Sequence, residues 1–311
     1  MIPTDHEVVN KRNQLENEKL KKKIDKMEKA EEKEIIELYR EALEDIQLEV
    51  LRYENKGLLT ITAILAYNRL VNLEKRIVEE VSDLNKGVRG NIKAYTANVY
   101  LQKYEGMQNL YSRALGVEGL RFPKLDNNLV KAATKNTLDR IGWEARLLDI
   151  HARLSKTIRQ ELYSAINSGK SYTDIAKMLQ EKLEIGATQA MRIARTEGHR
   201  IVEQATLDAM MVAEKLGVKQ KKRWLATLDD RTRDIHQELD GVTIPINDYF
   251  TDGHGGRGLA PGQMGVASSD INCRCDLATI IEGFEPTTRI ARDAKGKNIK
   301  IPYMNYKEWD D

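Results

Sequence analysis

The sequence predicts an α+β protein, in which a long, mostly α-helical N-terminal region precedes a small α+β module with a short antiparallel sheet. Two observations lead to this prediction. Before residue 217, apolar side chains recur at steps of three and four residues and no strand-like run occurs. After Gly217, three short runs rich in β-branched residues follow, at 221–227, 242–246 and 275–281. We expect a helical region over residues 1–185, an α+β module over 186–283 and a polar, loosely ordered tail over 284–311.

The first expected helix is long and strongly charged. More than half of the residues between Lys11 and Asn55 carry a charge, and the stretch contains no Gly or Pro. Gly57 is expected to end this helix. Its second half carries a narrow apolar seam that predicts contact with a partner helix, formed by Ile36, Tyr39, Leu43, Ile46, Val50 and Tyr53.

Two more helices are expected next along the chain. An apolar stripe from Ala66 to Leu84 predicts a second helix, antiparallel to the first, that stops near Gly87 or Gly90. A third helix is expected over 91–115, where tyrosines recur at helical spacing. Such tyrosines are more often packing residues than a platform for nucleobases.

The rest of the N-terminal region is also predicted to be helical. After a connecting loop over residues 116–128, helical spacing resumes from Asn128 to about Ile166. A further helix is expected to start at Ser171 or Thr173, either of which can cap it, and to stop at Gly186.

A helix expected over residues 187–216 opens the C-terminal module. Glu197 and Asp208 fall on its apolar stripe. Because a buried carboxylate is costly unless it is paired, we expect Glu197 to meet Arg231 or Arg233.

The run LDDRTRDIHQELDG (228–241) predicts a short helix that stops before Gly241. Asp229 or Asp230 can cap it. His236 shares its apolar face, so this imidazole is expected to point inward. A glycine-rich loop over residues 251–269 is too long for a hairpin turn, and loops of this length are usually functional or mobile.

The first candidate functional site is a metal-binding site. Cysteine and histidine are the preferred zinc ligands, so His236, Cys273 and Cys275 are candidate ligands, with Asp270 or His254 as a fourth. The competing interpretation is that the two cysteines are small buried apolar residues that anchor the loop. The spacing Cys-x-Cys is tighter than that of most structural zinc sites.

Composition excludes several classes of protein. The 311 residues carry 50 basic and 48 acidic side chains, a net charge of +2, which is unlike a dedicated nucleic-acid binder. No uncharged stretch exceeds 12 residues, so we expect no membrane helix, and the start lacks the apolar run of a secretory signal. Only two cysteines occur, which fits a reducing cytoplasm.

A basic cluster in the C-terminal module is a candidate for weak phosphate contact. It includes Lys215, Arg231 and Arg233, and its candidate DNA contacts are Lys219, Lys221, Lys222 and Arg223. The competing interpretation is an ordinary solvated face.

An enzyme is the rival hypothesis for the whole chain. A metal-dependent hydrolase acting on nucleic acid or peptidoglycan would use His236 with neighbouring carboxylates, namely Asp229, Asp230 and Asp240. The sequence carries no Gly-x-Ser-x-Gly, Walker or His-Glu-x-x-His pattern. We therefore expect no catalytic residues.

Five motifs in order resemble those of the phage head-morphogenesis or minor head protein family, also called Mu F-like. They are ARTEGHR (194–200), Trp-x-x-Thr (224–227), LDDRTRDIHQELDG (228–241), APG (260–262) and INCRC (271–275). The resemblance covers about residues 186–283. Its motif residues are Arg195, Thr196, Glu197, Trp224, Asp229, Arg231, Thr232, His236, Asp240, Gly241, Pro261, Gly262, Asn272, Cys273 and Cys275.

The resemblance implies a structural virion protein of a tailed bacteriophage, made in the host cytoplasm. Such a protein would lie in the capsid interior near the portal vertex, with portal, capsid or scaffold proteins as partners, and would aid head assembly and DNA packaging or ejection. Many relatives have His-Pro before the Asn-Cys-Arg-Cys element, whereas this chain has Asp270 and Ile271. A carboxylate oxygen can also bind zinc.

Overall fold

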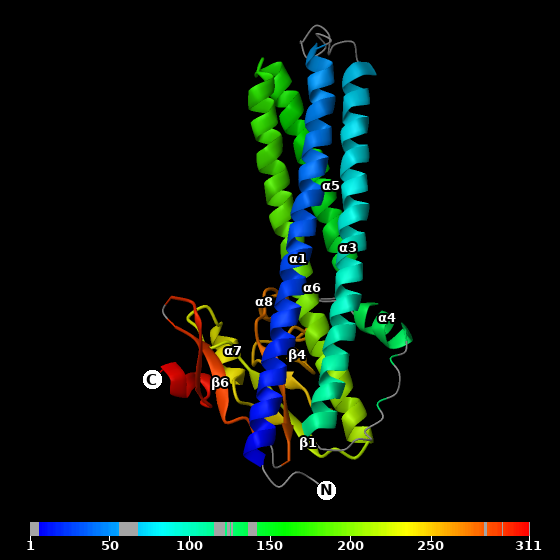
Figure 1. Cartoon of the computed structure of the whole chain (residues 1–311). Coiled ribbons are helices and arrows are strands. Elements are labelled where there is room, and N and C mark those ends of the chain that lie inside the picture. Colours follow the sequence, from blue (N-terminus) through cyan, green and yellow to red (C-terminus); the bar gives the residue numbers. More distant parts are fainter. Residues whose placement is uncertain are drawn as a thin grey trace. The chain divides into compact units, whose positions relative to one another are not determined.

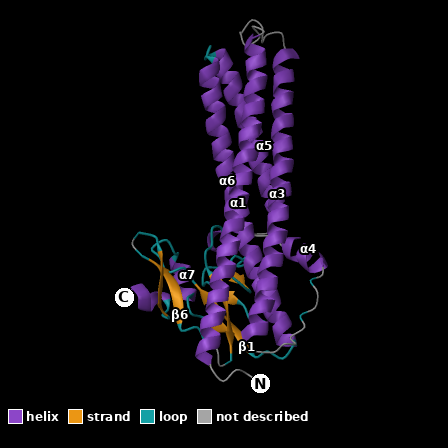
Figure 2. Cartoon of the chain, in the orientation of Figure 1, coloured by secondary structure: helices purple, strands orange, loops and turns teal. Residues whose placement is uncertain are grey.

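The computed structural model describes residues 6–55, 68–114, 122, 125, 127–135, 142–282, 285–293 and 295–310. The helices and strands are shown in Figures 1 and 2. Among these residues, five helices precede the first strand: α1 (His6–Asn55), α3 (Asn68–Ala114), α4 (Asn127–Lys135), α5 (Trp143–Asn167) and α6 (Tyr172–Lys215). The later elements are β1 (Gln220–Leu225), α7 (Asp234–Leu239), β2 (Thr243–Ile244), β3 (Phe250–Thr251), β4 (Arg257–Gly258), α8 (Ala267–Asp270), β5 (Asp276–Ile281), β6 (Thr288–Arg292), β7 (Asn298–Pro302) and α9 (Tyr306–Asp310).

This order confirms the predicted fold class: a mostly helical N-terminal region followed by small antiparallel sheets. The chain divides into two compact units. The helical unit comprises residues 29–94 and 143–194, and the mixed unit comprises residues 1–28, 95–142 and 195–311. Helices α1, α3 and α6 each supply residues to both units. None of the described helices is long and apolar enough to cross a membrane.

Parts of α1, α3, α5 and α6 form the core of the helical unit. Buried side chains at steps of three and four supply it, and Ile35, Tyr39, Ile46 and Val50 of α1 are among them. The predicted seam on α1 is therefore largely buried, although Ile36 lies exposed. Ser171 caps α6 as expected, since its Oγ accepts from Asp174 N at 3.3 Å.

Two glycines expected to stop helices instead lie inside them. Helix α3 continues through Gly87, and α6 continues through Gly186. A Cβ at Gly186 would lie 2.9 Å from Tyr39 Cε1, and one at Gly87 would lie 3.3 Å from Leu38 Cδ2. Because glycine has no side chain, the neighbouring helices can approach closely at these two positions. This packing outweighs the low helix propensity of glycine. The end expected at Gly57 falls outside the described residues.

The described part of the mixed unit contains three small antiparallel sheets. The largest has the strand order β2-β1-β5, and Trp224 of β1 pairs with Leu277 of β5. Strands β3 and β4 form a two-stranded sheet in the glycine-rich loop, and β6 pairs with β7. The apolar core beside the largest sheet includes Trp224, Phe250, Cys273 and Cys275.

The C-terminal residues differ from the loose tail expected from sequence. Arg289 of β6 is buried, and its guanidinium donates to Asp240 at 2.7 and 3.1 Å. The same carboxylate accepts from Tyr306 N at the start of α9, at 2.6 Å. A buried carboxylate with four donors thus fixes the hairpin and α9 to the rest of the mixed unit, a contact that polar composition alone does not reveal.

Candidate metal centre

The first motif lies on α6, where the chain is buried on several sides. Glu197 and Arg200 are both buried, and Arg200 Nε donates to Glu197 Oε2 at 2.9 Å. The predicted burial of Glu197 is confirmed, but the partner expected at Arg231 or Arg233 is corrected to Arg200 of the same helix. Arg200 Nη1 also donates to Ala133 O of α4, at 3.1 Å.

The second motif places a tryptophan and a histidine side by side. Trp224 is fully buried on β1, and its ring meets that of His236 edge to face, with centroids 5.6 Å apart. His236 lies on the inner side of α7 and is buried, as the spacing predicts. The helix N-cap is Arg233, so neither Asp229 nor Asp230 caps it.

Asp229 instead organises the turn before α7. Its carboxylate accepts from Arg274 at 2.5 and 2.7 Å and from Thr232 Oγ1 at 3.2 Å. Burial raises the pKa of Asp229, but the Arg274 ion pair outweighs this effect and brings the pKa down to about 2. The carboxylate is thus a fixed anion, which suits a structural ion pair rather than proton transfer.

Contacts from three of the earlier motifs hold the INCRC segment. Arg233 Nη2 donates to Ile271 O at 2.5 Å, and Thr227 Oγ1 donates to Arg274 O at 2.7 Å. Asn272 has φ 55°, in the left-handed region that asparagine tolerates, and its N–H donates to Thr196 Oγ1 at 3.4 Å. These contacts fix the backbone on both sides of Cys273 and present both thiols to His236.

His236, Cys273 and Cys275 form a buried group whose potential ligand atoms all lie within 4.8 Å of one another. Cys275 Sγ lies 3.3 Å from His236 Nδ1, and Cys273 Sγ lies 4.0 Å from it. Around a tetrahedral zinc ion, sulfur and nitrogen ligands are separated by about 3.6 Å, given the usual bond lengths. The three residues that the sequence predicted as ligands are therefore brought together in a geometry that can hold a metal.

The electrostatics of the two cysteines differ. A hydrogen bond from Cys275, together with the imidazoles of His199 and His236, holds the pKa of the Cys273 thiol well below its ordinary value. Burial raises the pKa of Cys275. A thiolate is the form of cysteine that binds metal, so Cys273 is prepared for this role.

The expected fourth ligands do not join the group. His254 is exposed in the glycine-rich loop. Asp270 is buried, but its two carboxylate oxygens accept from Met264 N and Gly265 N, each at 2.8 Å.

Sequence reasoning missed His199, although it lies in the ARTEGHR motif. Burial lowers the pKa of His199, but a hydrogen bond with the Cys273 thiol and the charge of that thiol outweigh this effect and raise the pKa to about 9. A Cβ at Gly262, in the APG motif, would lie 3.3 Å from His199 Cδ2. The φ of 74° at Gly262 also favours glycine.

Two more motif residues, Asp240 and Gly241, have structural roles, and a third, Arg195, lies at the surface. Asp240 is held by Arg289, as described above, and Gly241 has φ 82° at the turn after α7. Arg195 is exposed, with Nε 3.9 Å from Glu28 Oε1. Asp230 and Arg231 are also exposed.

The basic cluster is split between the surface and the interior. Lys219 and Lys221 are exposed, but Lys222 is fully buried, and its Nζ donates to Leu259 O at 2.8 Å. Burial lowers the pKa of Lys222 to about 8. Arg223 is half-buried, with Nε 2.7 Å from Thr243 Oγ1. Lys222 therefore does not lie on the surface where phosphate contact was expected.

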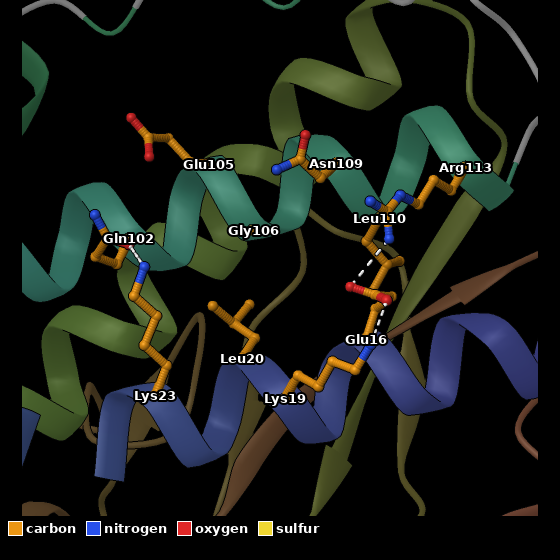
Figure 3. A pocket seen from close by; sticks show the side chains of 10 residues that line it. All are labelled: Glu16, Lys19, Leu20, Lys23, Gln102, Glu105, Gly106, Asn109, Leu110 and Arg113. Atoms are coloured by element: carbon orange, nitrogen blue, oxygen red, sulfur yellow. Dashed lines mark hydrogen bonds and ion pairs between the residues drawn. The ribbon is translucent and has the colours of Figure 1, made fainter. Parts of the chain in front are cut away.

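A groove of about 270 Å³ lies elsewhere in the mixed unit, between α1 and α3 (Figure 3). Three of its charged side chains form ion pairs, in which Glu16 accepts from Lys19 at 3.1 Å and from Arg113 at 3.0 Å, and Lys23 donates to Gln102. Leu20 lies against Gly106 at its floor. None of the residues that line the groove belongs to the five motifs.

Comparisons with known proteins agree with the arrangement of the motifs. The family model described as Phage Mu protein F like protein matches residues 156–278. The minor head protein GP7 of Bacillus phage SPP1 is 30% identical over 298 residues, which cover 94% of this chain and 96% of that protein. No solved structure matches.

A second relative is named as an enzyme. The NAD(+)--arginine ADP-ribosyltransferase EFV of Enterococcus faecalis is 30% identical over 297 residues, or 94% of this chain. The chain spans only 60% of the length of that relative. Since the SPP1 protein is matched over nearly its whole length, this chain belongs to the Phage Mu F-like family of minor head proteins.

Proposed function

We propose that this chain is a structural minor head protein of a tailed bacteriophage, located in the capsid interior near the portal vertex. The observation that carries the proposal is the match to the SPP1 minor head protein, which covers more than nine tenths of both chains. Portal, capsid or scaffold proteins are the proposed partners, and head assembly with DNA packaging or ejection is the proposed role.

The helical unit supplies the proposed docking surface. It exposes large apolar side chains, among them Leu148 with 61% and Ile185 with 55% of its surface accessible. Exposed apolar side chains are favourable to bury against a protein partner. Their presence on helices supports recruitment of the chain through its helical unit.

We propose no catalytic role for this chain. The transferase relative extends well beyond the part that this chain matches, because the chain spans 60% of its length. Two carboxylates that the rival hydrolase would use are engaged in ion pairs, Asp229 with Arg274 and Asp240 with Arg289. These pairs favour a structural role for both carboxylates. Incubation with NAD⁺ and an arginine acceptor is expected to give no ADP-ribosylation, and transfer by the purified chain would contradict this proposal.

Zinc is the proposed cofactor, held by His236, Cys273 and Cys275. The donor set of one imidazole and two thiols suits zinc better than magnesium or calcium, which prefer oxygen ligands. Its proposed role is to fix the INCRC segment to α7.

Weak DNA contact is proposed for the exposed part of the basic cluster, Lys219 and Lys221. Binding through so few phosphates is weak at any salt concentration and weakens further as salt rises. We expect retention of the chain on duplex DNA at low salt and its loss at physiological salt. Absence of retention at low salt would remove DNA from the proposed partners.

Quantitative mass spectrometry of gradient-purified procapsids and virions tests the main proposal, with portal protein as the internal standard. We expect a fixed ratio of this chain to portal, well below that of the major capsid protein. Leu148→Glu together with Ile185→Glu should reduce that ratio, whereas Asp83→Asn, at an exposed position of the same unit, should not. Absence of the wild-type chain from both particles would refute the structural role.

A further inference from the structure

We propose that a second groove of the mixed unit receives the β6–β7 hairpin of another copy of this chain. This groove, here called the α7 groove, has a volume of about 450 Å³ and is lined by α7, β2 and β3 with the residues that flank them. Clefts that bind a partner group usually measure about 300–1,000 Å³. The inference concerns self-association and goes beyond the head-protein role proposed above.

Apolar side chains line most of the α7 groove. Six of its ten lining residues are apolar or aromatic, and among these Leu239 and Phe250 are buried. Val242 and Tyr249 keep 37% and 48% of their surfaces accessible. Exposed apolar surface that gathers in one hollow favours a partner, because contact removes that surface from water.

Contacts inside the mixed unit hold the walls of the α7 groove in place. Phe250 packs edge to face on Trp224, with ring centroids 5.3 Å apart. The Asp252 carboxylate accepts from His254 N at 2.9 Å and from Gly256 N at 2.8 Å, which fixes the start of the glycine-rich loop. A groove that is already formed loses little conformational entropy when it is filled.

The charges at the α7 groove are mainly acidic. Glu238 lies in its wall, is exposed and has no ion-pair partner among the described residues. Asp234 and Asp248, each next to a groove-lining residue in sequence, are exposed as well. Arg257 also contacts the wall, and its Cζ lies 4.4 Å from the centre of the Tyr249 ring. The acidic excess favours an occupant that is both apolar and basic.

The β6–β7 hairpin carries both properties on one face. Ile299 keeps 40% of its surface accessible. The ladder extends to Lys297, because Asp293 N donates to Lys297 O at 3.0 Å, so strand alternation places Lys297 and Ile299 on the same face. Lys297 is exposed and, among the described residues, has no ion-pair partner. The Arg289–Asp240 pair fixes the hairpin and presents this face as a rigid element.

The two surfaces complement each other. With Ile299 seated among the apolar walls, Lys297 could pair with Glu238 of the other copy. A contact between two different patches leaves one groove and one hairpin free, so a reciprocal pair or a larger assembly can follow. The contact is small, and we therefore expect a dissociation constant in the micromolar range.

Sedimentation velocity of the purified full-length chain over a range of concentrations gives the first test. The wild type should associate, and salt should weaken the association. Glu238→Lys and Lys297→Glu should each weaken it at least about tenfold, because like charges then face each other. An equal mixture of the two variants should associate again, since the altered groove of one meets the altered hairpin of the other. Glu41→Lys and Lys33→Glu, at exposed positions of the helical unit, are the matched controls and should behave like the wild type.

Two isoleucines of the hairpin give a second test that leaves the charges unchanged. Ile290 is 41% exposed, but it pairs with Lys300 and lies on the face opposite Ile299. Ile299→Ser should weaken association about tenfold, as for an apolar anchor in a contact. Ile290→Ser should leave association unchanged. Circular dichroism establishes whether each variant is folded, and the isoleucine pair decides if a charge variant is not.

The remaining outcomes would overturn the proposal. A wild-type chain that stays monomeric up to about 100 µM would exclude a second copy as the occupant. Association that the two charge variants leave unchanged, a mixture that does not recover, or equal effects of the two isoleucine variants would exclude this contact. None of these results bears on the head-protein proposal, which the particle measurements test separately.

Discussion

The buried ion pair between Arg289 and Asp240 makes a quantitative prediction about the C-terminal hairpin. Replacing Arg289 by Met keeps most of the side-chain volume but leaves the Asp240 carboxylate buried without its counter-ion. Breaking a buried pair in this way typically costs about 3–5 kcal/mol. Asp240 would keep two backbone donors, Ala226 N and Tyr306 N, each at 2.6 Å, so we expect a loss near the lower end, about 3 kcal/mol.

Urea unfolding followed by tryptophan fluorescence measures this loss. The chain has three tryptophans, of which Trp143 lies in the helical unit and Trp224 and Trp309 lie in the mixed unit. In a Trp143→Phe background the fluorescence therefore reports the mixed unit alone. With a slope of about 2–3 kcal/mol per molar urea, Arg289→Met should lower the midpoint by about 1 M or more.

Two further variants decide whether the reasoning is right. Lys300→Met changes a half-exposed charge in the same hairpin and should alter stability by less than about 0.5 kcal/mol. Adding Asp240→Asn to Arg289→Met should recover part of the loss, because it removes the unpaired charge. If Arg289→Met unfolds at the same urea concentration as Lys300→Met, the hairpin is not part of the cooperative unit and the argument fails.

Two predictions concern the helical unit. Burial lowers the pKa of His151 to about 4 from an ordinary value of 6.5. The neutral ring therefore stabilises the fold above pH 6.5, and up to about 3 kcal/mol of the free energy of unfolding is lost as the pH falls from 6.5 through 4. Urea unfolding of wild type and His151→Gln across this range should show their difference in stability shift by that amount, and a constant difference would contradict the burial argument. Gly186→Ala should destabilise by about 1–3 kcal/mol through the contact with Tyr39, whereas Gly90→Ala, with nothing within 4 Å of its Cβ, should stabilise by about 0.5–1 kcal/mol. Thermal unfolding checks this pair, and equal shifts in the same direction would show that helix propensity alone decides.

Local pattern predicted much of the fold. The three runs rich in β-branched residues became β1, β2 and β5 with ends displaced by a few residues, and Ser171 caps the helix that it was expected to start. Both features depend on neighbours in sequence. The role of Gly186 depends instead on a contact distant in sequence, because a glycine can either end a helix or leave room for a tyrosine of a neighbouring helix.

The site was predicted in part for a similar reason. The inward direction of His236 follows from spacing on one helix, and its meeting with the two cysteines was proposed from chemistry. His199 was missed because the stripe on α6 was read as a single buried face, whereas residues on several sides of this helix are buried. Lys222 shares a strand face with Trp224, so strict alternation along β1 was the available signal for its burial.

The division of the chain has a consequence for its synthesis. The mixed unit needs residues 1–28 from one end and residues 195–311 from the other. The ribosome adds about 5–20 residues per second, and domains made of one continuous segment can fold as they emerge. Here the first turns of α1 leave the ribosome long before their partners exist. The mixed unit can therefore complete its fold only after residues 195–311 have been synthesised, and until then apolar side chains of α1 such as Ile24 lack the partners that bury them in this unit.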